Sequence, residues 1–448
     1  MDPDFEPAVL WNRTYEQEAG TDSGAEPVTI GLLRNDTVVA RRTLAVLPDA
    51  ERSFLYLERM LKTLLWSVGG NRILFAGPDT LFERLKKHYA ESPVGRFDSE
   101  MIGKKIFGRA IQVVKVRSDQ IPEPVRESAA LGRHLEGCRI GFDLGGSDRK
   151  CAAVIDGKVV FSEEIKWNPY FEKNPQYHYD GIMDSLNRAA AYLPRVDAIG
   201  GSAAGVYVNN EVRVASLFRG VKAEDFETEV RPIFKKVKRA WNGVPFEVVN
   251  DGEVTALAGA MSLNDHAVLG ISMGTSLAAG YVTPEGNITT WLNELAFVPV
   301  DYRKNGPVDE WSGDIGCGVQ FFSQQGVARL ATLAGIEFPE KTPFAEQLVK
   351  VQRLMTENDP RARSIYETIG ICFGYTIAYY ATFYQFRNLL ILGRVTSGEG
   401  GQVIIEKAEE VLKTEFPELA ATVKISMPDE QMKRHGQAVA AASLPMIG

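Results

Sequence analysis

Two aspartates in this 448-residue chain directly follow apolar stretches, where a carboxylate is well placed for chemistry. The first, Asp143, ends the run 140–142 and precedes the pair Gly145-Gly146. Glycines let backbone N–H groups approach a ligand closely and form an anion cradle. Because Mg²⁺ is held by one or two carboxylates together with substrate phosphates, the pattern predicts a phosphate-binding turn with Asp143 as metal ligand. The alternative is a glycine-rich hairpin with a surface aspartate, since an isolated glycine-rich motif is a weak signal.

The second aspartate, Asp251, follows a predicted buried strand (246–249) and Asn250, and a helix is expected over 252–262. Ligands of open α/β sheets bind at the carboxyl ends of strands. An aspartate in this place can accept the proton of a hydroxyl group that attacks a γ-phosphate. The alternative is that Asp251 only caps the helix, which is a common role for this residue.

A second glycine turn, Gly274-Thr275-Ser276, lies between predicted strands at 268–272 and 277–282. Two such hairpins facing one another across a cleft would clamp a triphosphate. Lys150, on the strand after the first turn, is a weaker candidate for countering phosphate charge, and a solvated hairpin lysine is the alternative. The expected nucleotide contacts at the two turns are Gly145, Gly146, Ser147, Lys150, Gly274, Thr275 and Ser276.

The run 143–147, Asp-Leu-Gly-Gly-Ser, resembles the first phosphate motif of the actin-like ATPase and sugar-kinase superfamily, and is most similar to that of its ROK (repressor, open reading frame, kinase) branch. Gly274, Thr275 and Gly280 resemble the second phosphate motif. Asn250-Asp251 resembles the family segment whose Asp is the catalytic base and whose Asn binds sugar. The segment after a predicted strand at 389–392 resembles the adenosine motif through Gly393 and Gly398, although a glycine-rich helix C-cap loop is an alternative there.

The resemblance covers about 138–448 and implies an α/β, two-lobed actin-like ATPase (ribonuclease H-like) fold. It places one lobe at 138–262 and the other at 263–448, with the last helix packing back on the first lobe. Residues 1–137 alternate predicted strands and helices, so we expect an additional N-terminal α/β domain, with a degenerate lobe as the alternative. Residues 1–25 are expected to be frayed or lightly docked, and 117–137 to be a linker.

The sugar-binding positions of the resemblance are altered. Glu294 is kept, but Phe297 stands where the family has a histidine, and Ser216 stands where it has an asparagine. Ser202 lies in a turn of small residues that indicates either close ligand approach or tight packing. We therefore expect substrate contacts from Asn250, Glu294, Ser202 and Ser216, with a glucose-type substrate in doubt.

The stretch 310–319 is similar to the ROK zinc motif at Gly313, Gly316 and Cys317, but it lacks two cysteines and the final glutamate. A structural zinc site needs about four ligands. The sequence therefore predicts no zinc.

The composition is that of an ordinary globular protein, with 45% hydrophobic and 24% charged residues. Its net charge of -8 argues against a nucleic-acid surface, and residues 1–137 show no helix-turn-helix with a basic recognition helix. Four widely spaced cysteines and the absence of a secretory signal favour a cytoplasmic protein with reduced thiols. The uncharged stretch 368–386 is rich in Thr, Tyr and Gly, so we expect a buried helix and no membrane span.

These features predict an ATP- and Mg²⁺-dependent kinase of a small sugar-like molecule, with Asp251 as base and Asp143 as metal ligand. The alternatives are a non-catalytic sensor or assembly module that binds sugar or nucleotide, and an ATPase that acts on a partner. The sequence leaves a homodimer open.

Overall fold

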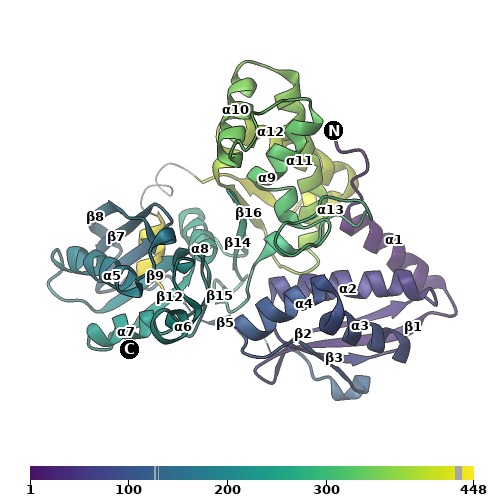
Figure 1. Ribbon diagram of the computed structural model, residues 1–448, viewed down its shortest axis with the longest axis horizontal. Coiled ribbons are helices and arrows are strands. Elements are labelled where there is room, and N and C mark those ends of the chain that lie inside the picture. Colours follow the sequence, from purple (N-terminus) through teal and green to yellow (C-terminus); the bar gives the residue numbers. More distant parts are fainter. Residues whose placement is uncertain (126–127, 130, 429–435, 448) are drawn as a thin grey trace. The chain divides into compact units, whose positions relative to one another are not determined.

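The computed structural model describes residues 1–125, 128–129, 131–428 and 436–447 (Figure 1). The chain forms two compact units and passes between them several times. The first unit comprises Met1–Glu127, Ile271–Ala279 and Thr290–Ser426, and the second comprises Ser128–Gly270, Gly280–Thr289 and Met427–Gly448. Residues 1–127 thus share a unit with most of the predicted second lobe. Whether they are an added domain or a degenerate lobe stays a prediction.

The second unit is built on a five-stranded sheet with β6 at its centre. β6, β7 and β8 pair antiparallel, while β9 runs parallel to β6 and β12 runs parallel to β9. The strands, in spatial order, are β12 (Phe246–Asn250), β9 (Ala198–Ala203), β6 (Cys138–Leu144), β7 (Asp148–Ile155) and β8 (Lys158–Lys166). Asp156 and Gly157 join β7 to β8 with positive φ angles of 46° and 77°, as a type I′ hairpin turn requires.

Alternate residues of β6 face opposite sides of this sheet. Ile140, Phe142 and Leu144 are buried in the core that helices α5 (Pro175–Ala190) and α7 (Ile233–Ala240) complete. Asp143 is on the other side, the one covered by helix α14 (Gln437–Ala442). Because β6, β9 and β12 are parallel, their carboxyl ends meet at one edge of the sheet.

Two glycines allow α14 to lie against the sheet. A Cβ at Gly141 would come within 2.0 Å of the Ala438 carbonyl oxygen, and one at Gly200 within 1.7 Å of the Ala441 carbonyl oxygen. No side chain fits in either place, so close packing of this helix depends on both glycines.

The first unit begins with a four-stranded sheet in the order β2-β1-β3-β4. β1 pairs antiparallel with both β2 and β3, whereas β3 and β4 are parallel. The strands are β1 (Glu26–Arg34), β2 (Thr37–Val46), β3 (Arg72–Ala76) and β4 (Gln112–Lys115), and the helices between them include α2 (Ala50–Ser67), α3 (Asp79–Glu91) and α4 (Pro93–Asp98).

A second large sheet repeats the strand order of the first. In each sheet, five strands taken in sequence order have the same spatial arrangement. The first strand lies between the second and the fourth. The third strand pairs with the outer edge of the second, and the fifth with the outer edge of the fourth. The repeat consists of β13 (Val268–Met273), β14 (Leu277–Val282), β15 (Ile288–Thr289), β16 (Asn388–Leu392) and β17 (Lys424–Ser426). This duplicated order confirms the predicted two-lobed α/β fold. The N-terminal sheet differs, since β1 and β3 are antiparallel where β6 and β9 are parallel.

The first residues of the chain, expected to be frayed or lightly docked, are docked by buried and ion-paired side chains. Helix α1 (Ala8–Thr21) buries Tyr15, whose hydroxyl lies 2.6 Å from Ser53 Oγ. Asp2 forms ion pairs with Arg303 (2.5 Å) and Arg329 (2.7 Å). The sequence did not indicate these contacts because the partners lie far away in the chain.

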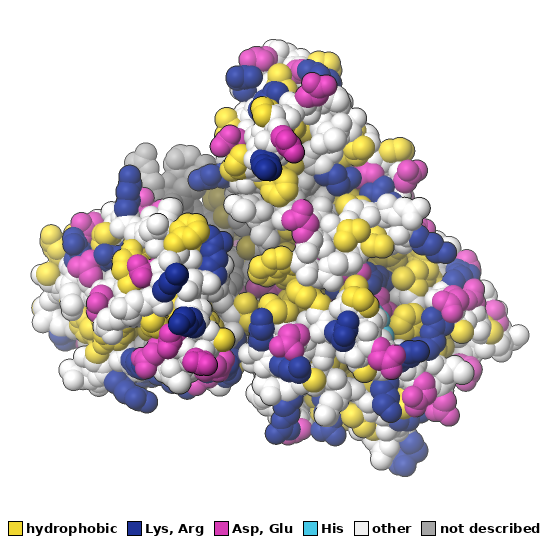
Figure 2. All heavy atoms as spheres, viewed as in Figure 1, with side chains coloured by type: hydrophobic (Ala, Val, Ile, Leu, Met, Phe, Trp, Pro, Cys, Tyr) yellow, Lys and Arg dark blue, Asp and Glu magenta, His cyan; other side chains and the backbone are white. Residues whose placement is uncertain are grey.

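The predicted linker at 117–137 lies partly outside the described residues, and within it β5 (Ser128–Ala129) pairs with β15. The uncharged stretch near 368–386 lies mostly in α11 (Pro360–Tyr380), where Ile369, Phe373 and Ile377 are buried. Within the described ranges, every helix is too short or too polar to span a membrane. On the face shown in Figure 2, cationic and anionic side chains are interspersed.

Candidate functional site

Asp143 lies at the carboxyl end of β6, in register with Ser202 on β9 and Lys150 on β7. Residues paired across neighbouring strands point to the same face, so the three side chains are neighbours. The Ser202 hydroxyl donates to Asp143 Oδ1 (2.7 Å), and the other oxygen accepts no hydrogen bond from the described residues. Burial raises the pKa of the Asp143 carboxyl group, while the Ser202 hydrogen bond and the Lys150 charge oppose that rise.

The turn after β6 is closed by its own backbone. The Gly145 N–H donates to the Asp148 carbonyl (2.9 Å), and the Ser147 hydroxyl donates to Asp148 Oδ2 (2.8 Å). Lys150 Nζ lies 3.9 Å from Asp148 Oδ1 and is partly exposed. This lysine therefore has a weak carboxylate partner in the turn itself.

Gly146 is required by a contact that the sequence did not suggest. A Cβ at this position would come within 2.0 Å of the Tyr170 hydroxyl oxygen. Trp167, in the same loop, donates from Nε1 to the Gly145 carbonyl (2.8 Å). The loop after β8 therefore lies against the glycine turn and holds its shape.

Asn250 and Asp251 lie where β12 passes into helix α8 (Asp251–Leu263). The N-cap is Asn250, whose Oδ1 accepts from the Gly252 N–H (2.7 Å) and whose Nδ2 donates to the Gly205 carbonyl (2.7 Å). Asp251 also accepts from the Gly252 N–H (2.9 Å). Since Asn250 already caps the helix, capping alone does not account for Asp251.

The carboxyl groups of Asp251 and Asp143 influence one another. Burial, followed by the negative charge of Asp143, raises the pKa of Asp251 to about 6. Tyr207 lies close by, and burial together with the Asp251 charge raises the pKa of its hydroxyl. Two carboxylates at one sheet edge with no ion-paired cation among the described residues are costly unless a ligand supplies positive charge.

This arrangement suits proton abstraction and cation binding. A general base works best when its pKa lies near the working pH, which the raised pKa of Asp251 approaches. Among the described residues, no cluster of three or more His, Cys, Asp or Glu side chains could hold a metal ion by itself. Mg²⁺ normally needs only one or two carboxylates beside phosphate oxygens, so the unbonded oxygen of Asp143 fits this ion.

In the first unit, the second glycine turn meets the segment that resembles an adenosine motif. The Gly274 N–H donates to the Ser276 carbonyl (2.9 Å), and the Gln324 N–H donates to the Gly274 carbonyl (2.9 Å). At the end of β16, Gly393 has a φ of 104°, and a Cβ there would come within 2.4 Å of the Met273 carbonyl oxygen. Because Met273 directly precedes Gly274, the two turns adjoin.

Three further predicted nucleotide contacts face outward. Thr275 and Ser276 are exposed, and Gly398 is the exposed N-cap of helix α12 (Glu399–Glu415). A Cβ at Gly398 would meet nothing within 4 Å, but its φ of 73° favours glycine.

Glu294 and Phe297 lie beside helix α2. The Glu294 N–H donates to the Trp66 carbonyl (2.9 Å). The Phe297 ring packs against Trp66 with a centroid distance of 4.1 Å and against Trp311, which is 69% exposed, at 6.3 Å. An apolar aromatic cluster thus stands where the resemblance would place a histidine.

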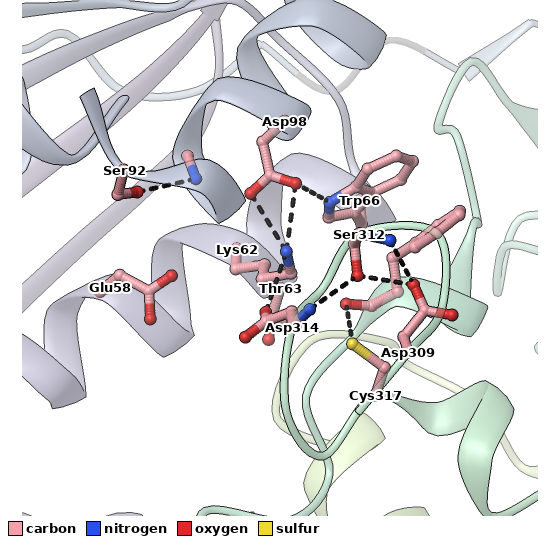
Figure 3. A network of polar contacts seen from close by, with 12 residues as sticks. Glu58, Lys62, Thr63, Trp66, Ser92, Asp98, Asp309, Ser312, Asp314 and Cys317 are labelled. Atoms are coloured by element: carbon pink, nitrogen blue, oxygen red, sulfur yellow. Dashed lines mark hydrogen bonds and ion pairs between the residues drawn. The ribbon is translucent and has the colours of Figure 1, made fainter. Parts of the chain in front are cut away.

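The stretch that resembles a zinc motif is held by a network of polar contacts (Figure 3). Lys62, fully buried on α2, pairs with Asp98 (3.1 Å) and with Asp314 (3.0 Å). Arg59 also pairs with Asp314 (3.0 Å). Burial raises the pKa of the Cys317 thiol, which disfavours the thiolate. These contacts explain how the loop is fixed by side chains alone.

The predicted site residues divide between the two units, and Glu294 lies beside α2, whereas Gly274 and Gly393 lie at adjoining turns. Ser216 lies at the exposed start of a 3₁₀ turn (Ser216–Phe218) in the second unit. The second-unit group is Asp143, Gly145, Gly146, Ser147, Lys150, Ser202, Asn250 and Asp251. The first-unit group is Gly274, Thr275, Ser276, Glu294, Gly393 and Gly398.

Sequence reasoning missed Trp167 and Tyr170. Both lie in a loop rich in proline and aromatic residues between β8 and α5, and that composition was the available signal. It gave no indication that the loop folds back onto Gly145 and Gly146.

A scan against protein-family models and a search of curated proteins found no match to this chain. Solved structures do resemble it. The ROK hexokinase from Thermus thermophilus aligns with a TM-score of 0.55 and 17% identity, over 69% of this chain and 97% of that one. A ROK family transcriptional regulator, described as a homolog of the E. coli MLC protein, aligns with a TM-score of 0.52 and 18% identity, over 69% of this chain and 79% of that one.

A ROK family glucokinase from Streptomyces griseus, solved with glucose and AMPPNP, aligns with a TM-score of 0.50 and 19% identity, over 70% of this chain and 100% of that one. This chain therefore has the two-lobed actin-like fold found in ROK-family proteins, as the motifs predicted. Sugar kinases and a regulator share that fold, so the fold by itself does not choose between their activities.

Proposed function

We propose that this protein is a divergent ROK-type kinase of the cytoplasm that transfers the γ-phosphoryl group of ATP to a hydroxyl group of a sugar or sugar-like molecule. The observation that carries the proposal is the pairing of Asp251 with Asp143 beside a glycine turn. One carboxyl group there has a pKa near 6, and neither forms an ion pair within the described residues.

In this proposal Asp251 accepts the proton of the attacking hydroxyl group, and the Asn250 amide and Glu294 orient the acceptor. Asp143, positioned by Ser202, would hold Mg²⁺. The metal, when bound, neutralises phosphate charge. The glycine turns at Gly145, Gly146 and Gly274 would lie against phosphate oxygens, with the Gly146 N–H as donor because the Gly145 and Gly274 N–H groups close their own turns. The glycines at 393 and 398 would admit the adenine base. No zinc is required, because ion pairs hold the loop that resembles a zinc motif.

The second candidate is a sensor that binds sugar or nucleotide without turnover. Two observations favour it. Phe297 replaces a polar sugar contact with an aromatic cluster, and a transcriptional regulator shares the fold. A third candidate, an ATPase acting on a partner, would hydrolyse ATP without any sugar acceptor.

The test is ADP release from MgATP with a panel of sugars, polyols, amino sugars and sugar acids. We expect acceptor-dependent turnover that falls by about 10²- to 10⁴-fold in Asp251→Asn, as for loss of a general base. Asp225→Asn, which makes the same change at an exposed position of the same unit, should behave as wild type. Because the base must be ionised, kcat/KM should fall as the pH drops through about 6.

ATP binding without turnover for any acceptor would favour the sensor. Hydrolysis that no acceptor stimulates would favour the partner-driven ATPase. Turnover that is equal in Asp251→Asn and wild type would exclude Asp251 as the base.

A further inference from the structure

A rigid corner lies beside the first glycine turn, formed by two 3₁₀ segments, Pro169–Phe171 and Ser216–Phe218. His178, which is fully buried, joins them, since its Nε2 lies 3.2 Å from the Pro169 carbonyl and 3.1 Å from the Leu217 carbonyl. Both partners are acceptors, so Nε2 carries the hydrogen. A Cβ at Gly220 would come within 2.5 Å of the Glu172 carbonyl oxygen, so the segments touch there as well.

The corner is bonded to the glycine turn. The Trp167 N–H donates to the Ser147 carbonyl (3.1 Å), and its Nε1 donates to the Gly145 carbonyl (2.8 Å). The Tyr170 hydroxyl occupies the space that a side chain at Gly146 would need. The Tyr170 hydroxyl therefore contacts the glycine turn, and the face of the Tyr170 ring is left for another group.

Arg219 covers it. The guanidinium carbon lies 4.1 Å from the centroid of the Tyr170 ring and 5.3 Å from that of Phe171, which is 73% exposed. Within the part of the chain that the structure describes, no carboxylate forms an ion pair with Arg219. An arginine stacked on a ring keeps its N–H edge free for two parallel hydrogen bonds to a carboxylate or phosphate.

We propose that Arg219 is an anion-binding residue of the site, and that its guanidinium, held on the Tyr170 and Phe171 rings, binds phosphate or carboxylate oxygens of a ligand beside Gly146. The proposal rests on the proposed function for the identity of the ligand. Two groups in a bound ligand have this anionic chemistry, namely the transferred phosphoryl group and an acidic substituent on the acceptor.

The argument for a ligand over a purely structural role rests on charge. Arg188 and Arg195, two other arginines near the surface of this unit, pair with carboxylates. The exposed Arg239 forms no ion pair among the described residues, but no aromatic ring holds it either. Arg219 is fixed by stacking next to a turn whose backbone suits anions, yet its charge has no partner. Arg219 is exposed, and because stacking already fixes its guanidinium, less side-chain entropy is lost when it binds an anion.

The test compares wild type with Arg219→Ala and Arg219→Lys, and uses Arg195→Ala as an exposed control. Calorimetry with inorganic phosphate and with ADP measures anion binding without turnover. We expect affinity about tenfold or more weaker in Arg219→Ala, as for loss of a charged hydrogen bond. Arg219→Lys should be intermediate, because it keeps the charge but not the fork, and it provides the comparison if Arg219→Ala folds poorly.

Steady-state kinetics distinguish binding of the transferred phosphoryl group from binding of an acidic substituent on the acceptor. If Arg219 binds the transferred phosphoryl group, kcat falls with every acceptor. If it binds an acidic substituent, KM rises only for sugar acids or sugar phosphates, while neutral acceptors are unaffected.

Wild-type phosphate binding and wild-type kinetics in Arg219→Ala would overturn the inference. A wild-type protein that shows no turnover with any acceptor would defeat the kinase proposal alone. Loss of phosphate binding in Arg219→Ala would still support the anion site in that case.

Discussion

Two pairs of carboxylates in this molecule have opposite surroundings. Asp143 and Asp251, in the second unit, form no ion pair with any lysine or arginine of the described residues, and burial raises the pKa of both. Asp98 and Asp314, in the first unit, share the buried ammonium group of Lys62, and Asp314 also pairs with Arg59.

The difference in neighbouring charges indicates a different role for each pair of carboxylates. Burial alone would raise the pKa of Asp314, but the charges of Arg59 and Lys62 outweigh it and lower the pKa to about 2. At Asp98, which shares only Lys62, burial still outweighs the ion pair and raises the pKa. Carboxylates neutralised by fixed cations have no charge left for a ligand and serve to hold elements together. Carboxylates left without cations keep a negative field that a metal ion, a proton or a substrate can satisfy.

The largest effect on stability is expected from Lys62→Met, which removes the shared cation of the compensated pair. Breaking a buried ion pair by removing one partner leaves an uncompensated buried charge and costs about 3–5 kcal/mol. The free energy of unfolding, measured with urea, should fall by that amount.

Lys104→Met is the matched control, because Lys104 forms an exposed pair with Glu100 one helical turn away (2.8 Å). Its removal should cost less than about 0.5 kcal/mol. Equal, small losses in both variants would show that the Lys62 network contributes little to stability.

The next largest effect is a change in the free energy of unfolding, and it has opposite signs for an aspartate of each pair. Asp251→Asn should raise the free energy of unfolding at pH 7 by about 1–3 kcal/mol, because it removes a carboxylate whose ionisation folding disfavours. Asp314→Asn should lower it by about 2–3 kcal/mol, because it removes a carboxylate that folding stabilises.

The pH dependence separates these causes. The folded pKa of Asp251, about 6, lies above its ordinary value of 3.8, so the cost of its charge appears as the pH rises between these values. The gain in Asp251→Asn should vanish below about pH 4. The folded pKa of Asp314, about 2, lies below 3.8, so its contribution is present above about pH 4 and is lost as the pH falls toward 2. Unfolding followed from pH 2 to 8 checks both, and matching signs in the two variants would contradict the comparison.

The smallest effect concerns Asn250, which caps a helix and is also proposed to contact the substrate. Asn250→Ala should lose about 1 kcal/mol of stability, as for loss of an N-cap side chain. Asn250→Ser keeps a capping oxygen and should recover most of that loss. If the amide contacts the acceptor, turnover should stay low in both variants, whereas wild-type turnover in Asn250→Ser would leave Asn250 a structural role only.

Local pattern predicted the parts of the site that depend on local structure. Asp143 was found because it follows an apolar run and precedes Gly145-Gly146, and Asp251 because it comes between an apolar strand and a helix start. The strand order of both large sheets agrees with the resemblance. Each of these signals lies within a few neighbouring residues.

The remaining features depend on contacts between distant segments. Tyr170 explains Gly146, and Lys62 joins Asp98 to Asp314, but no short sequence window contains these partners. Residues 1–25 were expected to be frayed or lightly docked, because the partners of Asp2, namely Arg303 and Arg329, lie beyond the reach of any periodicity argument. Apolar alternation carries no information about which distant charges will meet.

The way the chain threads between its two units also governs when each can be finished during synthesis. Asp2 needs Arg329, so the earliest residues wait for most of the chain to be translated, which at about 5–20 residues per second takes on the order of tens of seconds. The central sheet of the second unit, made midway, receives α14 only after every strand of the first unit has been made. Each unit therefore needs a segment that is translated long after its first strand, and folding of both units is completed late.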